Sequence, residues 1–192
     1  MVVIDATTLM LLLRPGIPIP NGPNGLPIDR PKERIEFLVQ QLDKAGTNII
    51  IPTPALSEAL VRAGVVGSQE LVEKLQKFRV FRIEPFDLRA SIEVAAMSRD
   101  ALGGVNKRGK ADPKSTWAKI KFDRQIVAIA KVHAVTTIYS DDGDIRTLGE
   151  RAKIKVVSVA YLPLPPQKDQ IDWIENADIA AHGATGAQET KP

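Results

Sequence analysis

The sequence predicts a three-layer α/β/α sandwich around a mostly parallel, five-stranded sheet. Short β-branched and apolar runs alternate along the chain with longer segments that have the spacing of helices. The first two runs, Val2–Ile4 and Ile49–Ile51, are apolar throughout, as expected of strands buried on both faces of a sheet. Carboxylates follow these strands, and parallel strands bring such residues to one edge of the sheet.

The composition is that of an ordinary globular domain of 192 residues, long enough to bury a sizeable core. The net charge of +3 and the pI of about 9.2 allow a polyanionic partner without requiring one. The absence of cysteine excludes disulfides and thiolate metal sites, and two histidines are too few for an imidazole-rich zinc site. No apolar run reaches membrane-spanning length, so we expect a soluble, cytoplasmic protein without a membrane partner.

The first third of the chain contains a strand, a loop and a helix. Val2–Ile4 is the first strand and Asp5 follows it. The segment 14–31 holds six prolines and three glycines, which exclude a helix or a central strand. It is either a working loop or an insert on the surface. A helix is predicted over 31–46, with a periodic apolar side and Gly46 as its C-cap.

The middle of the chain continues the alternation. After the strand Ile49–Ile51, Thr53 and Pro54 open a helix that contains Glu58, and a second helix is predicted over 68–78. A strand at 80–83 and a helix from about 87 to 99 follow. The segment 103–121 is basic, with a net charge of +5 between residues 106 and 121. It is attractive to a phosphate backbone, although charge runs of this kind also occur as plain solvated loops.

The stretch 119–145 organises the rest of the chain. Helical spacing predicts one buried face, made of Phe122, Ile126, Ile129, Ala130 and His133. We place Asp123 in the first turn of this helix. Residues 136–139 are predicted as a strand that runs into Ser140-Asp141-Asp142-Gly143-Asp144, with Asp144 as the cap of a helix over 145–152. A last strand is predicted over 154–159. One domain is therefore expected over 1–160, followed by a partly disordered extension over 161–192.

Five carboxylates follow strands or begin helices in this scheme. They are Asp5, Glu58, Asp123, Asp142 and Asp144. Clustered carboxylates repel one another, and hard divalent cations such as Mg²⁺ and Mn²⁺ prefer carboxylate oxygens. One or two ions held there can activate a water for in-line attack on a phosphodiester. The chain has no cysteine and no plausible Ser-His-Asp arrangement that would supply a protein nucleophile instead.

These residues resemble the motifs of PIN-domain nucleases, and most of all those of VapC-like toxins. The resemblance spans Met1–Val159 and rests on four stretches, in order. They are VVIDAT at 2–7, the helix of Glu58, FDRQIVAIA at 122–130 and SDDGD at 140–144. It implies a parallel five-stranded sheet and a Mg²⁺- or Mn²⁺-dependent endoribonuclease, with RNA as substrate. A cognate antitoxin and a second copy of the chain are the expected protein partners.

The resemblance also implies roles for individual residues. Asp5, Glu58, Asp123 and Asp142 match the catalytic, metal-binding acids, Asp144 is a secondary ligand, and Thr7 matches the residue that supports the first acid. For contact with the RNA backbone the basic candidates are Lys119, Lys121 and Arg124.

The chain departs from the family pattern at its last motif, which often reads Thr-Asn-Asp-x-Asp-Phe. Asp141 stands in place of Asn, so the sequence leaves open whether Asp141 or Asp142 is the primary ligand. Two other functions remain open. One is a non-catalytic RNA-binding or assembly module on the same fold. The other is a phosphotransferase with an aspartyl nucleophile, although such enzymes need a second Asp where Thr7 stands.

Overall fold

The computed structural model describes residues 1–14, 16–102 and 116–166. Its centre is a five-stranded sheet in the order β3-β2-β1-β4-β5, and every neighbouring pair of strands is parallel. The strands are β1 (Val2–Ile4), β2 (Ile49–Pro52), β3 (Phe81–Glu84), β4 (Thr137–Tyr139) and β5 (Lys155–Val157). This arrangement confirms the fold class that the sequence predicts.

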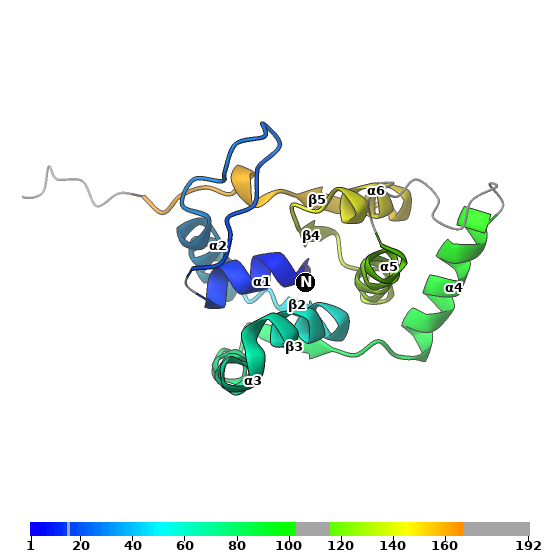
Figure 1. The fold of residues 1–192 in the computed structure, drawn as a ribbon, viewed down its shortest axis with the longest axis horizontal. Helices are drawn as coiled ribbons and strands as arrows, with labels where there is room; N and C mark the ends of the chain where they lie inside the picture. The colour runs from blue at the N-terminus through cyan, green and yellow to red at the C-terminus, as the bar shows by residue number, and fades with distance from the viewer. Residues whose placement is uncertain (15, 103–115, 167–192) are drawn as a thin grey trace, which may run out of the picture.

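Helices cover both faces of the sheet and make three layers. They are α1 (Ala6–Leu13), α2 (Pro31–Lys44), α3 (Thr53–Lys77), α4 (Leu88–Leu102), α5 (Trp117–Val132) and α6 (Gly143–Ala152), with a short 3₁₀ helix η1 (Val159–Tyr161) near the end of the described chain. Figure 1 shows α4 and α5 on one side of the strands and α1 and α2 on the other. None of the described helices is long and apolar enough to span a membrane.

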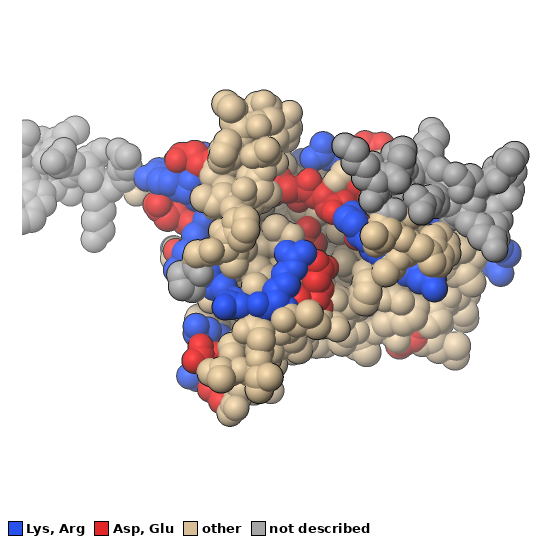
Figure 2. Space-filling model, in the orientation of Figure 1, with Lys and Arg blue, Asp and Glu red and all other residues tan. Residues whose placement is uncertain are grey.

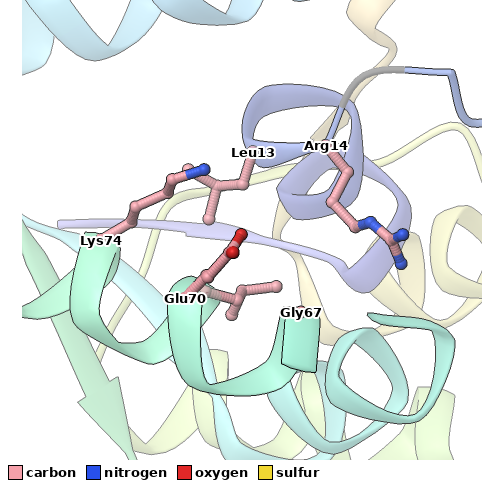
Figure 3. A pocket seen from close by; sticks show the side chains of 6 residues that line it. Leu13, Arg14, Gly67, Glu70 and Lys74 are labelled. Carbon is pink, nitrogen blue, oxygen red and sulfur yellow. The ribbon is translucent and has the colours of Figure 1, made fainter. Parts of the chain in front are cut away.

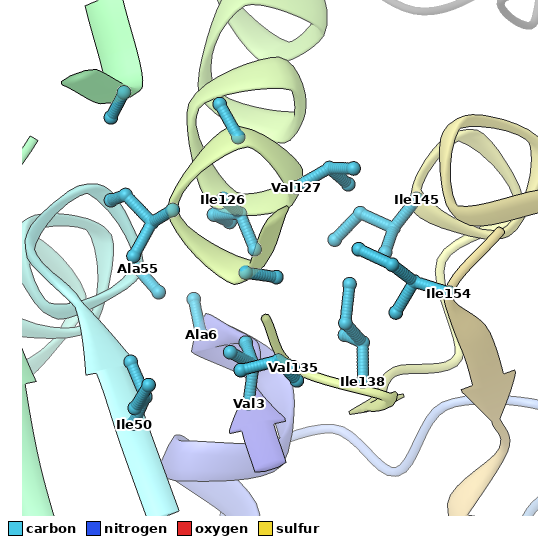
Figure 4. Close-up of a cluster of buried hydrophobic side chains, with 14 residues drawn as sticks. Val3, Ala6, Ile50, Ala55, Ile126, Val127, Val135, Ile138, Ile145 and Ile154 are labelled. Carbon is cyan, nitrogen blue, oxygen red and sulfur yellow. The ribbon is translucent and has the colours of Figure 1, made fainter. Parts of the chain in front are cut away.

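The alternation of side chains along the strands divides the core into two main clusters. Val3, Ile50 and Ile138 point toward α4, α5 and α6, where they pack against Ile126 and Val127. Figure 4 places these two α5 side chains above the strands β1 and β4. Because α5 packs so closely on β1 and β4, a polar residue of α5 next to this contact is held near the ends of both strands.

The opposite face of the sheet is covered by α1 and α3. Val2 and Ile4 of β1, together with Ile49 and Ile51 of β2, pack there against buried residues of these helices. Helix α1 was not predicted from the sequence, because Leu9–Leu13 is a continuous apolar run without the polar face that marks an amphipathic helix. The two helices predicted between 53 and 78 agree with the structure, because α3 is interrupted at Gly64, whose φ of 71° and ψ of 179° are not helical.

The proline-rich segment 14–31 packs on the domain mainly through Ile28, with Ile17 partly buried nearby. Ile28 is 4% exposed and belongs to a third cluster, with Leu11 of α1, Ile35 of α2, and Val159 and Leu162 near η1. As predicted, the described part of the segment has no helix and no sheet strand; its one regular feature is an isolated antiparallel bridge between Asn21 and Pro27. The segment is therefore a surface loop with an apolar anchor.

Helix α5 begins five residues earlier than the predicted face suggests. Thr116 is its N-cap, since its side chain accepts a hydrogen bond from the backbone of Lys119. Asp123 is consequently the seventh helical residue and does not lie in the first turn. Phe122 is 41% exposed and His133 is the C-cap, so both were wrongly assigned to the buried face. Of the basic segment, residues 103–115 lie outside the described part of the chain.

Candidate metal centre

The candidate centre lies where the order of strands reverses. The strand after β1 in the chain, β2, lies on one side of it, while β4 lies on the other. A crevice at such a switch point is where open α/β sheets bind ligands. Asp5 directly follows β1, and its backbone N–H donates to the Tyr139 carbonyl at 3.3 Å, at the end of β4. Residues that follow the two strands are thereby brought side by side.

Asp5 is buried and fixed by several donors. It is the N-cap of α1, and its carboxylate accepts a hydrogen bond from the Thr8 backbone N–H at 2.7 Å. The Ser140 hydroxyl donates to its second oxygen, and the same hydroxyl accepts from the Asp142 N–H at 3.1 Å. Ser140 therefore links the carboxylate after β1 to the loop after β4. Neither Ser140 nor Thr8 was predicted as a site residue, although the cap spacing from Asp5 to Thr8 is a recognisable signal.

Three other carboxylates meet beside Asp5. One oxygen each from Asp123, Asp142 and Asp144 lies within 4.8 Å of the others, a spacing at which they can share a metal ion. Asp123 comes from α5, and the other two come from the N-terminus of α6. The side chains of Asp123 and Asp144 are only 8% and 7% exposed, while that of Asp142 is 27% exposed. We call these three residues the acid triad.

The start of α6 positions two members of the triad. Asp142 is the N-cap, and its Oδ1 accepts hydrogen bonds from the backbone N–H groups of Asp144, at 2.8 Å, and Ile145, at 3.4 Å. The prediction that Asp144 caps this helix was therefore wrong by two residues. Asp144 lies in the first turn, where the helix dipole favours negative charge.

The ammonium of Lys119 lies at the centre of the triad. Its Nζ is 3.0 Å from Asp123, 2.8 Å from Asp142 and 3.0 Å from Asp144. Lys119 and Asp123 are four residues apart on α5, so the two side chains lie on the same side of the helix. The three acids thus converge on one positive charge.

Burial and mutual repulsion disturb the titration of this region. Burial, and then the charge of Asp142, raise the pKa of Asp123 to about 7. Burial also raises the pKa of Asp5, although the hydrogen bonds from Ser140 and Thr8 act in the opposite direction. For Lys119, burial acts to lower the pKa, but the hydrogen bonds to the three carboxylates outweigh it, and the pKa lies above its usual range. These directions are those of a site that favours a bound cation.

Asp141 points to a different part of the molecule. Its carboxylate accepts hydrogen bonds from the Ser158 hydroxyl and, at 3.4 Å, from the Val159 backbone N–H at the start of η1. Asp142, one residue later, faces Lys119 and the triad. In the structure, Asp142 is therefore the member of this pair that joins the acidic centre, while Asp141 ties the loop after β4 to η1.

Two of the predicted site residues do not join the cluster. Glu58 is 40% exposed at its side chain and forms an ion pair with Arg62, one turn along α3. Thr7 is partly buried, but the threonine that contacts Asp5 is Thr8, whose hydroxyl also donates to the Tyr139 carbonyl at 3.2 Å. Both Glu58 and Thr7 follow strands at the same edge of the sheet as Asp5.

The three basic candidates have different surroundings. Lys119 contacts the acid triad. Lys121 is exposed and its ammonium lies 5.6 Å from the centre of the Trp117 ring. Arg124 is 4% exposed, lies 5.5 Å from the same ring and donates to the Ser98 hydroxyl at 3.2 Å. Among the three, Lys121 is thus the one whose charge faces solvent.

Comparisons with known proteins complete the description of the fold. No protein-family model and no curated protein matches the sequence. The structure is similar to that of the DNA-bound VapBC complex from Salmonella typhimurium, with 13% identity, a TM-score of 0.52, and coverage of 82% of this chain and 97% of that one. The chain has the PIN-domain fold of VapC-like proteins. A second similar structure is VapC20 from Mycobacterium tuberculosis, a toxin that cleaves the sarcin–ricin loop, with 14% identity, a TM-score of 0.48, and coverage of 78% and 95%.

The acid triad of this PIN fold suits a hard divalent cation. Its donors are all carboxylate oxygens, which Mg²⁺ and Mn²⁺ prefer. They already surround a cation, the Lys119 ammonium, at hydrogen-bonding distance. Figure 2 shows acidic and basic side chains close to one another on one face of the molecule. The chemistry of these donors therefore fits such an ion.

Two further cavities of the PIN fold are lined by none of the predicted site residues. The smaller has a volume of about 240 Å³ between α1 and α3, with Glu70 between Arg14 and Lys74 (Figure 3). The larger, of about 580 Å³, lies among α1, α2, the end of α3 and β3. The larger has apolar walls, to which Leu12, Leu13, Val39, Phe78 and Phe81 contribute.

Proposed function

We propose that the chain is a metal-dependent endoribonuclease whose acid triad holds Mg²⁺ or Mn²⁺ beside Asp5. The observation that carries the proposal is the convergence of Asp123, Asp142 and Asp144, with oxygens within 4.8 Å of one another at the switch point of the sheet. The PIN fold shared with VapBC supports the same class of reaction. Glu58 is retained as a further proposed ligand, because it lies on the helix that follows β2 at the same edge.

An ion bound there would supply positive charge for the phosphodiester and acidify a water for attack on phosphorus. The protein residues hold the reacting groups in place. Asp123 is fixed by the packing of α5 on the sheet, and Asp142 by two backbone donors of α6. Asp5 is held by Ser140 and Thr8, so its carboxylate is oriented before substrate arrives. The expected products carry a 5′-phosphate and a 3′-hydroxyl.

Features around the triad favour a nucleic-acid substrate. The N-terminus of α6 directs the positive end of its dipole to the same place, which suits a phosphate. Lys121 lies on α5, two residues beyond Lys119, with its charge exposed. It is the basic residue that we expect to contact the RNA backbone.

Cleavage of RNA by the purified full-length protein tests the proposal. We expect cleavage with Mg²⁺ or Mn²⁺, none with a chelator, and a loss of at least about 100-fold in Asp5→Asn and Asp142→Asn. Asp141→Asn is the matched control, because it removes the neighbouring carboxylate that does not face the triad. Cleavage that persists in chelator, or that both active-site substitutions leave intact, would contradict a metal-dependent mechanism.

We also propose a protein partner of the antitoxin type. The similar structure from Salmonella typhimurium is a VapBC complex, and the larger cavity offers apolar walls with Lys32, Glu36 and Lys74 at the same site. An apolar side chain of a partner would fit there. The test is to co-express the chain with the product of an adjacent small reading frame and to compare co-purification with wild type and with Phe81→Ser. Equal recovery of the partner with both proteins would argue against binding at the cavity.

A homodimer is proposed as well, and sedimentation of the purified protein tests it.

One observation favours a second function, a non-catalytic RNA-binding or assembly module. The ammonium of Lys119 already compensates the acid triad in part, so the centre can exist without an exogenous ion. A protein that binds RNA equally well with Mg²⁺ and with chelator, and never cleaves it, would be of this kind.

A further inference from the structure

Lys119 contacts every member of the acid triad, and this is more than an ordinary surface ion pair. Its Nζ lies 3.0 Å from one oxygen each of Asp123 and Asp144, and 2.8 and 3.0 Å from the two oxygens of Asp142. A metal ion bound at that point would compete with the ammonium for the same carboxylate oxygens. Lys119 and a divalent ion therefore cannot both be bound to the complete triad.

The position of Lys119 in α5 is unfavourable for the helix itself. It is the third residue of α5, within the first turn, where the dipole of the helix repels positive charge. The first turn of α5 has no acidic residue that would compensate for it. The acid triad is thus what accounts for the conformation of this side chain.

The acids and the ammonium differ in how firmly they are held. Asp142 is bound by two backbone donors, and Asp123 and Asp144 are almost completely buried. The side chain of Lys119 is 40% exposed, and a lysine side chain has a flexible four-carbon stem. Its charged end can move to solvent without moving the backbone, whereas the Asp142 carboxylate is bound to the backbone at the start of α6.

We propose that Lys119 is an internal cation that occupies the metal position in the metal-free protein and leaves it when a divalent ion binds. The inference rests on the proposed function, because it needs the triad to be a metal site. Lys119 then lowers the apparent affinity for the ion, since binding must break three charge-assisted hydrogen bonds. It also keeps the cluster of acids compensated while no ion is bound. The released ammonium is left beside the site, where a phosphate of the substrate would be bound.

Titration of metal-free full-length protein with MnCl₂, followed by calorimetry, measures the competition. Lys119→Met keeps the length of the side chain and removes the charge, and we expect it to bind Mn²⁺ about ten-fold more tightly than wild type, equivalent to about 1.4 kcal/mol. Lys121→Met is the matched control. It removes the same charge from the same helix but lies outside the triad, and its affinity should stay within about two-fold of wild type.

A measurement on the wild-type protein shows the displacement directly and does not depend on the folding of a variant. Labelling of lysines with an amine-reactive reagent, read by mass spectrometry, reports how accessible each ammonium is. We expect labelling of Lys119 to become several-fold faster when MnCl₂ is added, while the rate at Lys121 stays the same. Labelling of Lys119 that is unchanged or slower with Mn²⁺ overturns the inference.

The outcomes separate the two proposals. Equal Mn²⁺ affinity of wild type and Lys119→Met, or weaker binding by the variant, overturns the role of Lys119 and leaves the metal site intact. Mn²⁺ binding to neither protein overturns the proposed function, and the inference with it. Tighter binding by Lys119→Met together with faster labelling of wild-type Lys119 supports both.

Discussion

The substitution Asp142→Asn separates the electrostatic role of this residue from its structural one. Asn is as good an N-cap as Asp, so the amide oxygen can still accept from the backbone N–H groups that begin α6. What the substitution removes is a negative charge 2.8 Å from the centre of the cation position, as marked by the Lys119 ammonium. We expect the fold to be retained and the affinity for a divalent ion to fall.

The size of the effect follows from Coulomb's law. Because Asp142 is 27% exposed, an effective dielectric constant of about 40 is appropriate, between the value for surface pairs and that of water. A unit charge at 2.8 Å then contributes roughly 3 kcal/mol. A divalent ion that displaces an ammonium gains one net charge, so the loss in Asp142→Asn is about 3 kcal/mol, or about 100-fold in affinity.

Mn²⁺ affinity of wild type, Asp142→Asn and Asp141→Asn, measured by calorimetry, checks this reasoning. Asp141→Asn removes a carboxylate that binds Ser158 and the start of η1, so we expect less than about a five-fold change in affinity but a loss of about 1–2 kcal/mol in unfolding free energy. The reverse pattern, with Asp141→Asn the weaker binder, would refute the assignment of Asp142 to the triad. Equal affinities in all three proteins would refute the triad as the metal site.

Three further predictions concern stability, measured by urea unfolding. Gly149→Ala should cost about 2 kcal/mol, because an added Cβ would lie 2.5 Å from a methyl of Val156, whereas Gly67→Ala, which meets only an ordinary contact, should be neutral or stabilising by up to about 1 kcal/mol. The pKa of Asp123, raised to about 7 in the folded state, means that the folded metal-free protein binds this proton more tightly than the unfolded chain. Its unfolding free energy should therefore fall between pH 5 and pH 7.5 by on the order of 2 kcal/mol, and Asp123→Asn should abolish that slope. Ser140→Ala should cost about 1–3 kcal/mol, because it removes the hydroxyl that donates to the second oxygen of the buried Asp5 carboxylate, and Ser91→Ala, at an exposed hydroxyl, should cost under about 0.5 kcal/mol.

The sequence was informative where one physical signal dominates. Val2–Ile4 and Ile49–Ile51 are apolar on both faces, and their burial made the parallel sheet predictable. The carboxylates that follow β1 and β4 were predictable as neighbours because parallel strands end at one edge. The start of α5 was not, because Phe122 satisfies the helical spacing of the core and yet faces solvent. Helix α1 was missed, since a helix buried on most sides lacks the alternation that marks its class.

The arrangement inside the site depended on three-dimensional packing that no spacing rule contains. Whether Asp141 or Asp142 faces the triad is decided by Ser158, which binds Asp141 from a segment 17 residues further along the chain. The contacts of Lys119 depend on how α5 packs against α6. From the sequence, Lys119 was predicted to contact the RNA backbone, whereas in the structure it contacts the acid triad. For Glu58, the sequence correctly predicted a helix after β2. It did not predict that Arg62, one helical turn further along α3, forms an ion pair with Glu58.

The hydrogen bond between Ser140 and Asp5 joins residues that are 135 positions apart. During synthesis, a nascent chain that extends only to the end of α3 contains Asp5 but neither β4 nor the start of α6. The acidic centre is therefore assembled only after translation has passed residue 144, and a truncated product cannot form it.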